Sequence, residues 1–136
     1  MEQILIIFGS AIFGFLGTVH LVYTFFTSKL HPKENAAIDA MKTSHLVLTR
    51  QTTVWNAWIG FNASHSLGAM VFASVYIQLC LWNFGVIEQS VWFSWLPVVV
   101  GAAYLVLAKR YWFHIPFIGI LISFLCFTVA AVLISL

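Results

Sequence analysis

Residues 53–82 read TVWNAWIGFNASHSLGAMVFASVYIQLCLW, and this stretch decides the fold class. It contains no Asp, Glu, Lys or Arg. A transmembrane helix needs about 20 consecutive apolar residues, so the stretch can cross a bilayer with a tilt or with its first turns outside. The whole chain of 136 residues is 62% hydrophobic and only 7% charged, whereas soluble domains carry about 25% charged residues. The sequence predicts an all-α integral membrane protein.

Three further apolar runs flank this segment, so the chain 1–136 is expected to form one domain of four transmembrane helices in an antiparallel bundle. NFGVIEQS and KRYWFH are short turns between the later spans. Pro116 suits the first turn of the last helix, where its missing N–H is harmless. The predicted spans are Ile4–Thr27, Thr53–Trp82, Val91–Ala108 and Ile115–Leu136.

The first loop, Ser28–Gln51, is predicted to contain a short amphipathic helix. Pro32 can begin a helix, and Ala37, Ile38 and Met41 fall on one side of it. Such a helix is expected to lie on the membrane surface, either as a plain connector or as a lid over a cytoplasmic opening.

The distribution of cations predicts the orientation. All six Lys and Arg residues fall in the first and third loops, while the opposite side carries only Glu2 and Glu88. The positive-inside rule then places both basic loops in the cytoplasm and both termini in the periplasm. A formal net charge of +2 is too small to favour nucleic acid as a partner. The cations are Lys29, Lys33, Lys42, Arg50, Lys109 and Arg110.

Polar side chains inside the first two spans form the candidate site. Trp58, Asn62 and His65 lie within about 60° of one another on a helix, since each residue advances about 100°. His20 and Thr24 lie on the first span at a related depth, in the cytoplasmic half of the membrane. Polar groups are costly in lipid and are expected to face the bundle interior.

A second set of residues predicts close helix packing. Small residues let two helix backbones approach in a membrane. The first span offers Ser10, Gly14 and Gly17, and the second offers the row Gly60, Ser64 and Gly68.

The polar cluster has several open interpretations. It is either interhelical hydrogen bonding alone, or a pocket for a quinone, another lipophile or a lipid headgroup. Axial ligation of a b-type haem by His20 and His65 is a less favoured alternative, as is proton-coupled transport. No metal site is predicted, because the spans contain no HxxxH pair and no carboxylate.

Motifs of catalysis are absent, which favours a non-enzymatic role. The chain has no GxSxG nucleophile motif, phosphate loop or pair of carboxylates. Cys80 and Cys126 are lone residues in apolar runs and indicate buried thiols without redox chemistry. No catalytic residue is predicted.

The segments TRQTTVWNAWIGFNASHSLGA (49–69) and LAKRYWFHIPF (107–117) resemble recurrent segments of a family of small bacterial four-span membrane proteins without an established activity. GTVHLVYTFFTSKLHPK at the end of the first span fits the same family, so the resemblance covers most of the chain. It implies a bacterial inner-membrane location and no catalytic residue. The layout is also similar to DoxX-like four-helix proteins, which implies a quinone-linked or accessory role.

We therefore predict an accessory subunit or lipophilic-ligand-binding module of a larger membrane complex. Its expected partners are membrane lipids and either other proteins or further copies of the chain. A quinone- or haem-linked electron-transfer protein using His20 and His65 is the main alternative, and a small proton-coupled transporter is the third.

Overall fold

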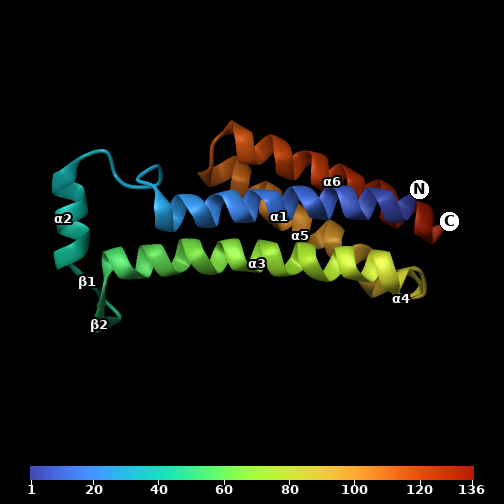
Figure 1. The fold of residues 1–136 in the computed structure, drawn as a ribbon, viewed down its shortest axis with the longest axis horizontal. Coiled ribbons are helices and arrows are strands. Elements are labelled where there is room, and N and C mark those ends of the chain that lie inside the picture. Colours follow the sequence, from blue (N-terminus) through green and yellow to red (C-terminus); the bar gives the residue numbers. More distant parts are fainter. The chain divides into compact units, whose positions relative to one another are not determined.

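A computed structural model describes all 136 residues, and helices account for most of them (Figure 1). Four helices are long and apolar enough to cross a membrane, which confirms the predicted helical class and the number of candidate spans. The elements are α1 (Glu2–Phe26), α2 (Asn35–Thr43), β1 (His45–Leu46), β2 (Thr49–Thr53), α3 (Val54–Trp82), α4 (Phe84–Glu88), α5 (Val91–Tyr111) and α6 (His114–Ser135).

The helix ends differ from the predicted spans mainly in α5. This helix continues to Tyr111, so Lys109 and Arg110 occupy its last turn and not a loop. Cations in the last turn interact favourably with the carbonyl end of a helix. Pro116 is the third residue of α6, as expected for a proline in a first turn.

The chain divides into two compact units, and α1 and α3 contribute to both. The first unit comprises Met1–Leu16 and Ala69–Leu136. Its core is centred on Phe13, which is buried. The Phe13 ring lies 5.5 Å from Phe72, 5.1 Å from Tyr104 and 5.9 Å from Phe127, measured between ring centroids. Residues of α1, α3, α5 and α6 therefore meet at one point.

Contacts along these helices show that the first unit is an up-down-up-down bundle. Gln3 and Phe13 of α1 contact Cys80 and Phe72 of α3 respectively, so these helices are antiparallel. The same reversal relates α5 to α6, where Trp95 bonds to Ser135 and Gly101 lies against Phe124. It also relates α1 to α6, where Gly9 lies against Phe127 and Leu16 against Gly119.

The second unit, Gly17–Gly68, holds the end of α1, the connecting segment and the first half of α3. The predicted helix in the connecting segment is α2, and none of its residues is buried. A two-stranded antiparallel hairpin follows it and was not predicted. The residues before α3 form a hairpin where an irregular loop was expected. The Val54 amide donates to the Ser44 carbonyl at 2.9 Å, and this bond closes the hairpin at the end next to α3.

Only part of the predicted small-residue packing is found within the chain. In α1, Ser10 and Gly17 are buried, and a Cβ on Gly14 would lie 3.1 Å from the Cβ of Ala73. In α3, by contrast, Gly60, Ser64 and Gly68 are exposed, and a Cβ on Gly60 would meet no atom within 4 Å. Gly60 therefore makes no close contact to another helix of the same chain.

The buried face of α3 lies elsewhere on its circumference. It is formed by residues three or four apart, which is the spacing of one helix face. Small side chains on that face allow the close approach that the glycine row was expected to provide. Its members are Ser66, Ala69, Ala73, Tyr76 and Cys80.

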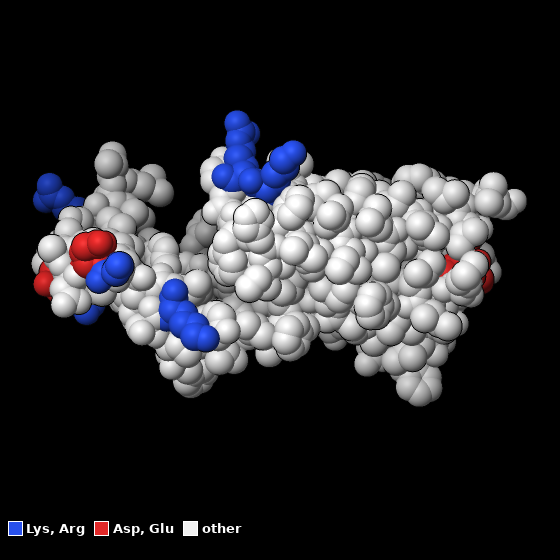
Figure 2. Space-filling view, turned by 90° about the horizontal axis from the view of Figure 1, so that it is seen from above, with Lys and Arg blue, Asp and Glu red and all other residues white.

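Charged side chains are confined to helix ends and connecting segments. In the first unit, Glu88 ends α4, and Lys109 and Arg110 lie at the far end of α5 from it. Figure 2 shows a broad surface without any charged side chain between the blue Lys and Arg side chains and the red acidic side chains at the far end of the long helices. Many large apolar side chains on the long helices are exposed, among them Phe8, Phe15 and Val71.

Candidate functional site

The centre of the candidate site is a hydrogen bond between α1 and α3. The Nε2 of His20 lies 2.9 Å from the Oδ1 of Asn62. The Asn62 amide group is oriented by its own helix, because Nδ2 donates to the carbonyl of Trp58 at 2.8 Å. The Asn62 oxygen is thereby left to accept, so the Nε2 of His20 carries the hydrogen of this bond.

His65 lies beside this pair, one turn further along α3. Its ring centroid is 5.6 Å from that of His20, and the two rings meet edge to face at 67°. Thr24 is buried one turn after His20 on α1, and its hydroxyl donates to the His20 carbonyl at 2.8 Å. The expected proximity of His20, Asn62 and His65 is present in the structure, whereas a ligand-binding role for them stays a prediction.

Trp58 belongs to a different cluster from the one the sequence predicted. Its backbone carbonyl serves Asn62, but its ring stacks on Trp55 with a centroid distance of 5.6 Å. His31, from the connecting segment, meets both rings edge to face, at 5.0 Å from Trp55 and 6.4 Å from Trp58. The Nζ of Lys42 lies 5.4 Å from the Trp55 centroid. This aromatic cluster anchors the connecting segment to the start of α3.

The arrangement of the two histidines does not fit a bis-histidine haem. Such ligation directs a ring nitrogen of each histidine at an iron between them. Here the Nε2 of His20 is directed at the Asn62 oxygen, and the edge of one imidazole meets the face of the other at a centroid distance of 5.6 Å. The structure also contains no group of three or more His, Cys, Asp or Glu side chains that could hold a metal ion.

Sequence reasoning missed a polar contact at Tyr76, which is buried in the first unit. Its hydroxyl donates to the Phe93 carbonyl at 3.0 Å. That carbonyl lacks its usual helical partner, because the residue four positions later is Pro97, which has no N–H. The signal in the sequence was Pro97 inside an apolar run, since a proline there leaves a carbonyl in need of a donor.

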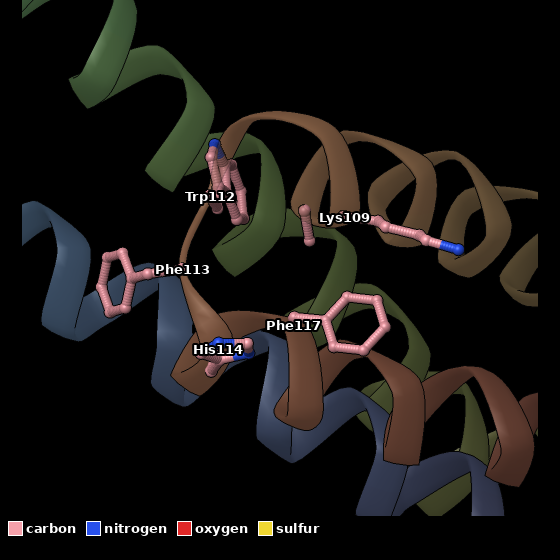
Figure 3. A pocket seen from close by; sticks show the side chains of 6 residues that line it. Lys109, Trp112, Phe113, His114 and Phe117 are labelled. Carbon is pink, nitrogen blue, oxygen red and sulfur yellow. The ribbon is translucent and has the colours of Figure 1, made fainter.

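A shallow pocket lies at the connection of α5 and α6. Its volume is about 280 Å³, and Trp112, Phe113, His114 and Phe117 supply most of its wall (Figure 3). The side chain of Lys109 runs along α5 away from Trp112 and His114 in this view. The pocket is lined mainly by rings and offers no convergent set of polar groups.

No protein-family model, curated protein or solved structure matches the chain.

Proposed function

We propose that the protein is a multi-pass membrane protein that serves as an accessory subunit, packing against another membrane protein or a further copy of itself. The observation that carries this proposal is the row Gly60, Ser64 and Gly68, which lies exposed on α3. Lipid tails are as apolar as leucine, so association between helices in a membrane depends on close packing of small residues. An exposed row of this kind is suited to pack against a helix of another chain.

The membrane setting is supported by the four long apolar helices and their large exposed side chains. We propose the bacterial inner membrane with both termini in the periplasm. All six Lys and Arg residues lie in the segment between α1 and α3 or at the end of α5. The positive-inside rule assigns those segments to the cytoplasm.

The small size of the remaining segments supports a non-enzymatic role. Outside the long helices, the chain has only one substantial connecting segment, residues 27–53, and two short links. No residue of segment 27–53 is buried, so this segment encloses no polar cluster. An accessory role needs only a complementary helix face, which the chain offers.

The test is a pair of bulky substitutions on exposed helix positions. Gly60→Leu fills space that is empty within the chain, so the monomer should fold normally. Ala103→Leu is the matched control, because Ala103 is also exposed on a long helix, α5, but lies outside any glycine row. Complexes extracted from native membranes are compared by native gel electrophoresis.

We expect Gly60→Leu to shift the protein to a smaller species while its helical circular dichroism stays unchanged, and Ala103→Leu to leave the complex intact. If both variants and the wild-type chain migrate as the same species, the proposed packing role of the row is wrong.

A second candidate function is the binding of a lipophilic molecule with a polar head, such as a quinone or a lipid, by His20, Asn62 and His65. The observation that favours it is the meeting of two imidazoles and an amide within apolar helices. His65→Ala should then release the bound molecule, measured by mass spectrometry of extracts, without lowering thermal stability. A loss of stability with no change in bound lipophile would assign the residue to packing.

A further inference from the structure

The tip of the hairpin presents two apolar side chains to the surroundings. Val47 and Leu48 connect β1 to β2, and their relative exposures are 110% and 91%. No other large apolar side chain, apart from that of the terminal Leu136, is as exposed. Water contact at this level is unfavourable for aliphatic side chains, so the tip is suited to an apolar environment outside the chain.

The backbone of the turn does not explain its two apolar residues. The hairpin turns that require Asn, Asp or Gly are those with positive φ angles, and no residue in the chain has a positive φ. A turn with negative φ angles accepts most residues, and polar ones are the common choice. Val47 and Leu48 are therefore compatible with the turn, and their exposure needs a reason outside the hairpin.

The hairpin projects away from the axis of α3, so its tip lies to one side of the start of that helix. His45 pairs with Thr53 across the strands, and its Nδ1 donates to the Thr52 carbonyl at 3.0 Å. Figure 1 shows the hairpin leaving the start of α3 across the helix axis and not as its continuation. If α3 crosses a bilayer, the tip therefore lies at the level of the first turn of α3, where the membrane surface would be.

The charges around the tip complement an anionic lipid surface. Arg50 is exposed two residues after Leu48, and Lys42 lies at the end of α2 just before the hairpin. Residues 27–53 contain four cations and only two carboxylates, Glu34 and Asp39. Apolar side chains flanked by cations are typical of segments that insert into the interfacial layer of a membrane.

We infer that Val47 and Leu48 insert into the interfacial layer of the bilayer that the long helices cross, on the side of the basic segments. This inference rests on the proposed membrane location. The tip then acts as a lateral anchor that fixes the connecting segment on the membrane surface beside the start of α3.

The test uses an environment-sensitive fluorophore on single cysteines in a chain whose Cys80 and Cys126 are replaced by alanine. Probes are placed at Leu48, at Phe15, which is exposed in the middle of α1, and at Asn35, which is exposed at the start of α2. The protein is reconstituted in phosphatidylcholine vesicles containing phosphatidylglycerol. Quenching is measured with nitroxide-labelled lipids and with iodide on both sides of the bilayer.

We expect the probes at positions 48 and 15 to be quenched by labelled lipid and protected from iodide, and the probe at position 35 to be quenched by iodide. A probe at position 15 that iodide quenches and labelled lipid does not would overturn the membrane location itself. With position 15 in lipid, a position-48 probe that iodide quenches as strongly as position 35 overturns the anchor alone. Protection of position 48 from both quenchers overturns it too, because a protein then covers the tip.

A second measurement guards against misfolding of the cysteine-free chain. A photoreactive benzophenone amino acid replaces Leu48, or in a control chain Asn35, in the otherwise unaltered protein, and its cross-links are identified by mass spectrometry. Cross-links to phospholipid support the anchor, whereas cross-links only to protein, or none above those of the probe at Asn35, contradict it.

Discussion

Replacing Tyr76 by Phe should destabilise the protein through a carbonyl on a neighbouring helix. The Tyr76 hydroxyl is the donor to the Phe93 carbonyl, which Pro97 deprives of its helical partner. Tyr76→Phe removes this donor, and in the membrane location proposed above, lipid offers the Phe93 carbonyl no other hydrogen bond. The effect should therefore depend on what residue 97 can donate.

The expected loss in the free energy of unfolding differs between a chain with Pro97 and a chain with alanine at that position. An unsatisfied buried acceptor costs about 1–3 kcal/mol, while an average interhelical hydrogen bond in a membrane contributes about 0.6 kcal/mol. We expect Tyr76→Phe to lower the free energy of unfolding by about 1–2 kcal/mol. In a Pro97→Ala background, the new backbone N–H can serve the Phe93 carbonyl, so the same change should cost under about 0.5 kcal/mol.

The assay is a double-mutant cycle of reversible unfolding in lipid bicelles titrated with sodium dodecyl sulfate. The cycle cancels the small void that Pro97→Ala leaves in the core. Ser123→Ala is the control, because the buried Ser123 hydroxyl donates to Gly119 within its own helix and its loss orphans no carbonyl. Equal costs of Tyr76→Phe in both backgrounds would refute the proposed coupling between Tyr76 and Pro97.

Two further predictions concern glycine and asparagine positions. Gly9→Ala should cost about 1–3 kcal/mol, because the added Cβ would lie 2.6 Å from the ring of Phe127. In the dissociated single chain, Gly60→Ala should instead stabilise α3 by up to about 1 kcal/mol, since its Cβ meets nothing within the chain. Thermal unfolding of both variants as detergent-solubilised monomers measures the two effects, and a larger loss at Gly60 would contradict the structure. Asn62→Ala should cost about 1 kcal/mol through the lost bond to His20, and nuclear magnetic resonance of the His20 ring nitrogens should show a change that is absent in Ser64→Ala, whose hydroxyl bonds only within α3.

The long helices could be predicted from the sequence because apolar composition is a strong signal over their whole length. The end of α5 was predicted three residues too early, since hydropathy marks the apolar part of a helix and not its last hydrogen bond. Lys109 and Arg110 illustrate this point, because polar side chains can continue a helix beyond its apolar part. The hairpin gave no signal at all, since its turn residues Val47 and Leu48 have the composition of a strand or helix.

The proximity of His20 and Asn62 could be predicted from matched depths in two antiparallel helices, but the packed face of α3 could not. α3 is apolar on all sides, so periodicity alone does not distinguish one face from another. The choice between the row containing Gly60 and the row containing Ala73 depends on which side chains the other helices present, and Gly14 of α1 meets Ala73. That information is absent from α3 itself.

Helices that are apolar on all sides can slide against one another with little change in buried area, so directional bonds are needed to fix their register. In the first unit, three such bonds connect the four long helices in succession, from α1 to α3, α3 to α5 and α5 to α6. The pairs are Gln3 with Cys80, Tyr76 with Phe93, and Trp95 with Ser135.

In the second unit, the bond between His20 and Asn62 fixes α1 against α3 in the same way. Fixing the register of α1 against α3 requires only that Asn62 accept a hydrogen bond from one donor on α1. A second imidazole, that of His65, is not needed for it. His65 is therefore the residue whose presence register alone does not explain. A functional role for the polar cluster is best sought in substitutions of His65 that leave the His20–Asn62 bond in place.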